Sequence, residues 1–103
     1  MTQRLPELRE AVLDAAMLDE LVRDLAALTS VHEVLLRGAP QELSSRAQRD
    51  VLELPPLLAT GQIRAAQVRY RYDDKDWCDT LLATDAGVRL LRMCMDSTEG
   101  GDP

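Results

Sequence analysis

The chain has 103 residues, of which 46% are hydrophobic and 29% are charged, and its formal net charge at pH 7 is −6. This length predicts a single domain, because one hydrophobic core typically serves about 100–150 residues. The acidic balance argues against nonspecific binding to nucleic acid and against polybasic contact with a membrane, both of which depend on Lys and Arg. We therefore expect neither nucleic acid nor membrane among the partners.

The location of the protein is predicted from what the sequence lacks. No stretch approaches the roughly 18 consecutive apolar residues that a membrane-spanning helix needs. Residues 1–10 are charged and have no apolar signal core, and two cysteines are too few for a disulfide framework. These features predict a cytoplasmic protein. Eleven arginines beside the single Lys75, with no phenylalanine, suggest a bacterial source with a GC-rich genome.

A long amphipathic helix is predicted from about residue 6 to residue 29. Apolar residues recur there at three- and four-residue steps, which places them on one stripe, and acids and arginines fill the opposite face. Pro6 suits the first helical turn, where its missing N–H is not needed. The pattern leaves open whether the helix breaks near residues 15–18.

A strand and a second helical region are predicted next. Residues 31–37 (VHEVLLR) are β-branched and aliphatic, which favours a strand. Residues 40–54 resemble a helix, because Ser45 and Gln48 have the spacing of a capping box before an apolar run. The two prolines at 55–56 are expected to end this region, and Leu57 and Leu58 to form one further turn that closes at Gly61.

Three strands joined by short polar turns are predicted in the last third, at residues 62–72, 77–84 and 88–95. Apolar and polar side chains alternate in the first of them, as in a strand with one buried face. Short connections make an antiparallel meander. The polar residues 96–103 (DSTEGGDP) have nothing to bury and are predicted to be a disordered tail.

The predicted fold class is α+β. The long N-terminal helix and the shorter helical region pack on one face of a three- to four-stranded antiparallel sheet, with residues 31–37 at an edge or inserted between other strands. We expect residues 1–95 to form one domain.

Turn chemistry extends the prediction to strand register. A two-residue loop at Asp74-Lys75 would place Tyr72 opposite Trp77, and a three-residue loop ending at Gly87 would fix the second hairpin. The face turned away from the aromatic residues then combines arginine with leucine, a mixture found at interfaces. A solvated face with a few exposed aliphatic residues is the alternative. The residues predicted to bind a partner are Arg69, Arg71, Leu82, Leu90 and Arg92.

In the same register, Cys78 lies opposite Cys94, close enough for a disulfide or a shared metal ion. A metal would still need two further ligands. A slip of one residue would instead place Cys78 opposite Met93, and free cysteines are often small buried hydrophobic residues. The pair is therefore a possible redox site, with plain packing as the alternative.

Other chemistry receives little support from the sequence. His32 has Glu33 as its neighbour, but adjacent strand residues point to opposite faces, so the carboxylate cannot readily orient the ring. The acids at 73–76 fit a hairpin turn better than a calcium-binding loop, which needs a central glycine and a terminal glutamate. Asp79 alternates onto the apolar face, where a tyrosine hydroxyl or an arginine must satisfy it; an acid–base role is the alternative. No glycine-rich phosphate loop is present, so no cofactor is expected.

These observations predict a non-enzymatic protein-interaction module, which serves as an accessory, assembly or regulatory factor for another protein. Dimerisation through the sheet is a natural variant, because two-fold dimers are the commonest oligomers. A redox- or metal-responsive protein built on the cysteines is the second hypothesis. The third hypothesis is an acidic inhibitor that mimics nucleic acid, and the last is an enzyme built on Asp79 or His32.

Overall fold

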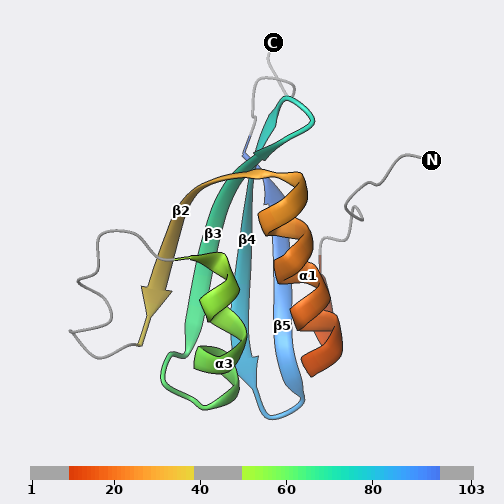
Figure 1. Cartoon of the computed structure of the whole chain (residues 1–103). Coiled ribbons are helices and arrows are strands. Elements are labelled where there is room, and N and C mark those ends of the chain that lie inside the picture. The colour runs from red at the N-terminus through yellow and green to blue at the C-terminus, as the bar shows by residue number, and fades with distance from the viewer. Residues whose placement is uncertain (1–9, 39–49, 96–103) are drawn as a thin grey trace.

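The computed structural model describes residues 10–38 and 50–95. Its strands form one five-stranded antiparallel sheet in the order β1-β5-β4-β3-β2, and its helices lie together on one face of that sheet (Figure 1). This confirms the predicted α+β class. The predicted three to four strands are too few, because residues 10–13 form a strand at the edge of the sheet instead of part of a helix. In chain order, the elements are β1 (Glu10–Leu13), α1 (Ala15–Leu28), β2 (Ser30–Arg37), the 3₁₀ helix η1 (Val51–Glu53), α3 (Leu54–Ala59), β3 (Ala65–Tyr72), β4 (Lys75–Thr84) and β5 (Gly87–Cys94).

The first element corrects the predicted N-terminal helix. Residues Glu10–Leu13 form a short strand that pairs antiparallel with β5, and α1 begins only at Ala15. Asp14 separates the two elements and caps the helix, because the backbone N–H of Met17 donates to its Oδ1 at 2.8 Å. In its place at the sheet edge, β1 pairs with backbone groups of β5 that would otherwise face water. Residues 6–9 of the predicted helix lie outside the described residues.

The apolar stripe of α1 lies against the sheet, as the periodicity predicts. Its buried residues recur at three-, one- and three-residue steps and are Leu18, Leu21, Val22 and Leu25. They pack with the apolar residues of α3 and of the strands in one core cluster. Burial of each such side chain favours folding by about 1.5–3 kcal/mol, so this stripe anchors the helix layer.

The prolines at 55–56 begin a helix rather than end one. They occupy the first turn of α3, where a missing N–H removes no hydrogen bond. Asp50 precedes them and accepts a hydrogen bond from the backbone N–H of Leu52 at 2.9 Å, which caps η1. Most of the predicted helical region at 40–54, including the capping box at Ser45 and Gln48, lies outside the described residues.

The three-stranded meander is confirmed as β3, β4 and β5, and residues 31–37 form the edge strand β2. The first hairpin nevertheless turns one residue earlier than predicted. Asp73 and Asp74 form its loop, both with positive φ (57° and 63°), as in a type I′ turn. Tyr72 therefore pairs with Lys75 rather than with Trp77. The resulting shift of two residues leaves every side chain on its predicted face.

The second hairpin differs in a way that reverses a face. Its loop has two residues, Asp85 and Ala86, so Thr84 pairs with Gly87 instead of Val88. Gly87 is already a strand residue, and a Cβ built on it would lie 2.6 Å from the carbonyl oxygen of Leu13 in β1. The shift of one residue moves every side chain of β5 to the opposite face from the prediction.

Candidate functional site

No described helix covers the sheet face that points away from α1 and α3. Both helices lie on the other side of the sheet (Figure 1), and the strand register groups the side chains that share this uncovered side. We call it the open face. Its side chains are those of Glu10, Val12, Ser30, Glu33, Leu35, Arg37, Ala65, Gln67, Arg69, Arg71, Asp76, Cys78, Thr80, Leu82, Thr84, Arg89, Leu91 and Met93.

The charges of the open face are arranged as cross-strand pairs. Arg71 Nη1 lies 3.1 Å from Asp76 Oδ1, and Arg69 Nη1 lies 3.9 Å from Glu33 Oε1. At the β1 edge of the same face, Arg89 pairs with Glu10. All these side chains are about half exposed, so each pair contributes at most about 1 kcal/mol to stability. Their main effect is to neutralise one another across the face.

On the part of the open face formed by β1, β5 and β4, apolar side chains lie beside Thr80 and the Arg89–Glu10 ion pair. Val12 is 53% exposed and Met93 is 63% exposed, while Leu82 and Leu91 are partly buried between them. Cys78, which pairs with Met93, continues the apolar surface. Exposed large side chains that lie near one another in this way mark interaction surfaces more often than isolated exposed residues do. We call these five residues the apolar patch.

The predicted partner-binding residues divide between the two faces. Arg69, Arg71 and Leu82 lie on the open face, as predicted. Leu90 and Arg92 do not: they are 1% and 6% exposed and lie under the helices. Because the β4–β5 register differs by one residue, Leu91 and Met93 replace them on the open face. Sequence reasoning missed Val12 and Glu10, because β1 was predicted to be helical.

Arg92 instead completes a buried polar cluster. Its Nε donates to Asp79 Oδ1 at 2.9 Å and its Nη2 to Oδ2 at 2.7 Å, while the Tyr70 hydroxyl donates to Oδ1 at 2.9 Å. The expectation that a tyrosine or an arginine satisfies Asp79 is confirmed by both. Burial, followed by the adjacent Asp79 carboxylate, raises the pKa of Tyr70 above its ordinary range. Burial alone would lower the pKa of Arg92, but the hydrogen bonds and charge of Asp79 outweigh that effect and raise it. Neither group therefore loses its proton near neutral pH, and the cluster suits a structural role.

The two cysteines do not form a pair. Cys78 pairs with Met93 and faces the open side, whereas Cys94 pairs with Trp77 on the helix side. Both thiols are free; Cys78 is buried and Cys94 is exposed. The expectation that Cys78 lies opposite Cys94 is therefore wrong, and the alternative register, with Cys78 opposite Met93, is the one observed. Within residues 10–38 and 50–95, no cluster of three or more His, Cys, Asp or Glu side chains could hold a metal ion.

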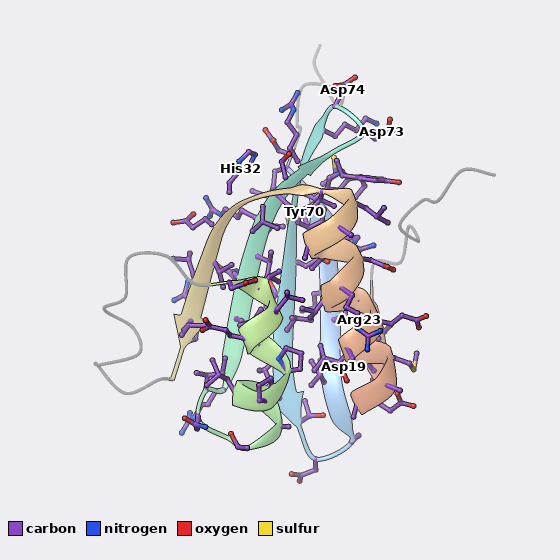
Figure 2. All side chains as sticks on the ribbon, viewed as in Figure 1. Asp19, Arg23, His32, Tyr70, Asp73 and Asp74 are labelled. Carbon is purple, nitrogen blue, oxygen red and sulfur yellow. The ribbon has the colours of Figure 1, made fainter. Side chains whose placement is uncertain are left out.

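His32 lies at an irregularity of β2, where the pairing with β3 shifts between Val31 and Glu33. Its Nε2 is 3.9 Å from Asp76 Oδ1, and both side chains are half exposed. Asp76 also accepts a hydrogen bond from Arg71 at 3.1 Å. Figure 2 shows His32 beside the start of β2, and Asp73 and Asp74 at the tip of the β3–β4 hairpin. Asp73 and Asp74 thus form the loop of a hairpin, as predicted.

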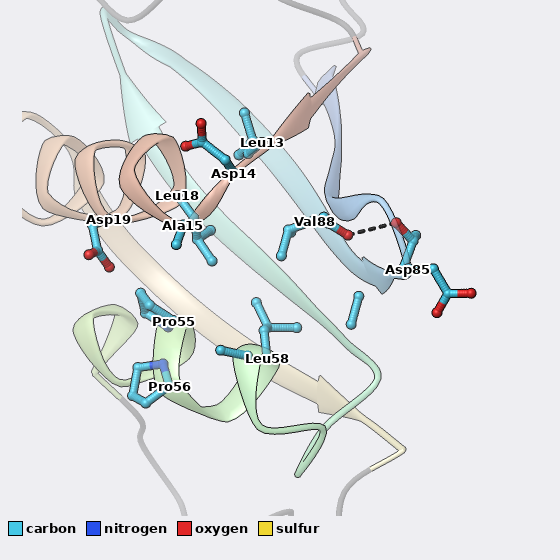
Figure 3. Close-up of a pocket in the computed structure, with 14 residues that line it drawn as sticks. Leu13, Asp14, Ala15, Leu18, Asp19, Pro55, Pro56, Leu58, Asp85 and Val88 are labelled. Carbon is cyan, nitrogen blue, oxygen red and sulfur yellow. Dashed lines mark hydrogen bonds between the residues drawn. The ribbon is translucent and has the colours of Figure 1, made fainter.

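A pocket of about 530 Å³ lies on the helix side, where the beginnings of α1 and α3 meet the β4–β5 hairpin (Figure 3). Its walls are mostly aliphatic and include Leu18, Leu58 and Val88. The full lining consists of Leu13, Asp14, Ala15, Leu18, Asp19, Pro55, Pro56, Leu58, Ala59, Ala83, Thr84, Asp85, Gly87 and Val88. The pocket and the open face are separated by the thickness of the sheet.

Comparison with protein-family models, with curated proteins and with solved structures gives no match. Among the described helices, none is both long enough and apolar enough to cross a membrane.

Proposed function

We propose that the chain is a non-enzymatic protein-interaction module, with an accessory, assembly or regulatory role in the cytoplasm, and that its open face packs against the open face of a second copy. The observation that carries the proposal is the exposure of Val12 and Met93 within the apolar patch, on a sheet face that no described element covers. Two free thiols are in keeping with a reducing compartment.

The size of the open face suits a dimer. Strands lie about 4.8 Å apart and rise about 3.3 Å per residue, so a face five strands wide and about eight residues long measures about 24 by 26 Å. Stacking two such faces would bury about 1,200 Å² in total, which is the lower end of the range for specific interfaces. Sheets pack face to face in this way in β-sandwiches, about 10 Å apart.

The charge of the open face supports a second copy as the partner. The chain as a whole carries −6, so most of its surface repels a second copy. The open face is close to neutral, and its charged residues are Arg37, Arg69, Arg71 and Arg89 with Glu10, Glu33 and Asp76. Two copies could meet here with little repulsion, and a two-fold axis would place each apolar patch against its equivalent.

The mass of the purified protein in solution tests the proposal. Sedimentation velocity at micromolar concentrations should give twice the chain mass for the wild type and the monomer mass for Met93→Glu, because the substitution places a charge in the apolar patch. Met17→Glu is the matched control: Met17 is 46% exposed on α1, away from the open face, and this variant should remain dimeric. Circular dichroism would establish that all three chains are folded.

Two results would overturn the second-copy proposal. A wild-type chain that remains monomeric throughout this concentration range would do so, as would a Met93→Glu chain that dimerises as strongly as the wild type. A monomeric wild type that binds a different protein in a Met93-dependent manner would assign the open face to that protein instead.

A further inference from the structure

The pocket beside the β4–β5 hairpin is independent of the open face and lies on the other side of the sheet. Its volume of about 530 Å³ falls within the range of about 300–1,000 Å³ that ligand-binding pockets occupy. Leu18 from α1, Leu58 from α3 and Val88 from β5 form apolar walls from three separate elements. A pocket built by three elements of one packed core is largely formed before a ligand arrives, which lowers the conformational cost of binding.

The charged residues of the lining all have the same sign. They are Asp14, Asp19 and Asp85, and no lysine or arginine of the described chain contributes to the pocket. The Asp14 carboxylate accepts a hydrogen bond from the backbone N–H of Met17, as the cap of α1. Asp19 and Asp85 are exposed and lie on opposite sides of the pocket (Figure 3). The mouth of an apolar pocket is therefore surrounded by negative charge, which favours a cationic ligand.

From this charge complementarity, we propose that the pocket binds a peptide segment of a partner protein in which apolar side chains are flanked by lysine or arginine. The apolar side chains would fill the space between Leu18, Leu58 and Val88. The flanking cations would lie near Asp19 on one side and Asp85 on the other. A small monoamine carries one positive charge and can neutralise only one of these aspartates, whereas a peptide can place one cation beside each; the placement of the two therefore favours a peptide.

Fluorescence anisotropy with synthetic peptides tests the proposal on the full-length chain. The probe is a fluorescein-labelled Lys-Leu-Leu-Leu-Arg peptide, and the comparison peptides are Glu-Leu-Leu-Leu-Glu and Lys-Ser-Ser-Ser-Arg. We expect saturable binding of the first peptide only. Equal binding of the Glu-flanked peptide would overturn the electrostatic argument, and equal binding of the serine peptide would overturn the role of the apolar walls. Failure of the probe to bind at millimolar protein would overturn the proposal as a whole.

Two pairs of variants localise the binding. Asp19→Lys should weaken binding of the probe by about tenfold. Glu20→Lys is its control: it changes the net charge equally, on an exposed residue of the same helix outside the lining, and should bind the probe as the wild type does. Ala59→Phe places a bulky side chain at the pocket and should also weaken binding. Its control is Ala27→Phe, at an exposed position of α1 outside the lining. If Asp19→Lys and Ala59→Phe both bind as the wild type does, the peptide does not occupy this pocket.

Two further measurements separate a peptide from a small cation and peptide binding from dimerisation. If hexylammonium displaces the probe at the peptide's own concentration, the pocket takes a small cation and the peptide proposal is wrong. The Met93→Glu chain should bind the probe as the wild type does, because its substitution lies on the open face. Dimerisation and peptide binding can thus fail separately, and loss of one would leave the other intact.

Discussion

Arg92 and Asp79 face each other directly across β5 and β4, and two hydrogen bonds of 2.9 and 2.7 Å join the guanidinium to both carboxylate oxygens. Both side chains are almost fully removed from solvent, which costs several kcal/mol per ion before the bonds are made. A slip of one residue in β5 would move Arg92 to the open face and leave Asp79 buried without it. The pair therefore favours the observed β4–β5 register over the alternative that the sequence also permits.

Removing only one member of this pair should destabilise the fold strongly. Arg92→Met would leave the Asp79 carboxylate buried with only the Tyr70 hydroxyl to satisfy it, and we expect a loss of about 3–5 kcal/mol in the free energy of unfolding. The double variant Asp79→Leu, Arg92→Met should recover most of that loss, because no charge then remains buried. Urea unfolding followed by circular dichroism measures both. The single variant Asp79→Leu completes the comparison. If the stability lost in the double variant equals the sum of the losses in the two single variants, the two side chains are not coupled.

Tyr70 should make the fold sensitive to alkaline pH. In the unfolded chain its hydroxyl ionises near its ordinary pKa of about 10, whereas burial and the Asp79 carboxylate raise the pKa in the folded protein. Above pH 10 the unfolded chain therefore releases a proton that the folded chain keeps, and stability falls by up to about 1.4 kcal/mol per pH unit from this group. Below that range the contribution is fully present.

The variant that isolates this effect is Tyr70→Phe. It should lose about 1–2 kcal/mol at pH 7 with the hydrogen bond to Asp79, and its stability should fall less steeply than that of the wild type above pH 10. Unfolding free energies measured from pH 7 to pH 11 test both statements. Parallel curves for the two proteins above pH 10 would assign the alkaline sensitivity to other groups.

Elements could be predicted from the sequence where the spacing of apolar residues fits only one kind of secondary structure. The alternation of β3 fits a strand and does not fit a helix, so its position and its buried face could be predicted. The residues of β1, EAVL, continue the helical spacing of α1, and four residues are too few to show a period of two. Pairing with β5 decides between the two conformations, and that pairing is a tertiary contact that no local pattern contains.

The residues of the open face could be predicted only as accurately as the two hairpin turns, because each turn fixes which side chains share a face. An Asp-Asp pair is not the typical sequence of a type I′ turn, so the positive φ of Asp73 and Asp74 could not be inferred. That error of two residues left Arg69, Arg71 and Leu82 on the correct face. The error of one residue at Gly87 placed Leu90 and Arg92 on the wrong one. That Asp79 needs a tyrosine or an arginine as partner, in contrast, follows from the cost of burying a carboxylate alone, although the identity of Arg92 as that partner does not.

The strained turn offers a stabilising substitution. Asp74 holds a φ of 63°, which an L-residue adopts at a cost and glycine adopts freely. Asp74→Gly should therefore raise the free energy of unfolding by about 0.5–1 kcal/mol, because the left-handed strain is relieved. Asp85→Gly is the control: Asp85 lies in the other two-residue loop without positive φ, and there glycine only adds freedom to the unfolded chain. Thermal unfolding of both variants should shift in opposite directions, and equal shifts would contradict the argument.

Replacement of Gly87 by alanine should destabilise the fold more than the same replacement of Gly61. Its φ of 132° is unfavourable for any L-side chain, and an added Cβ would lie 2.6 Å from the carbonyl oxygen of Leu13. Gly87→Ala should therefore cost about 2–3 kcal/mol and separate β1 from β5. Gly61→Ala is the matched control, because its φ of 77° is also left-handed but nothing lies within 4 Å of the new methyl group, so only about 1 kcal/mol should be lost.

The two alanine variants also differ in where they loosen the structure. Hydrogen exchange of the β1 amides should accelerate in Gly87→Ala and remain unchanged in Gly61→Ala, because only Gly87 contacts the backbone of β1. Since Val12 belongs to β1, the Gly87→Ala chain should also lose part of the apolar patch and dimerise more weakly than the wild type. Equal exchange rates in the two variants would mean that β1 does not depend on the close approach of Gly87 to Leu13.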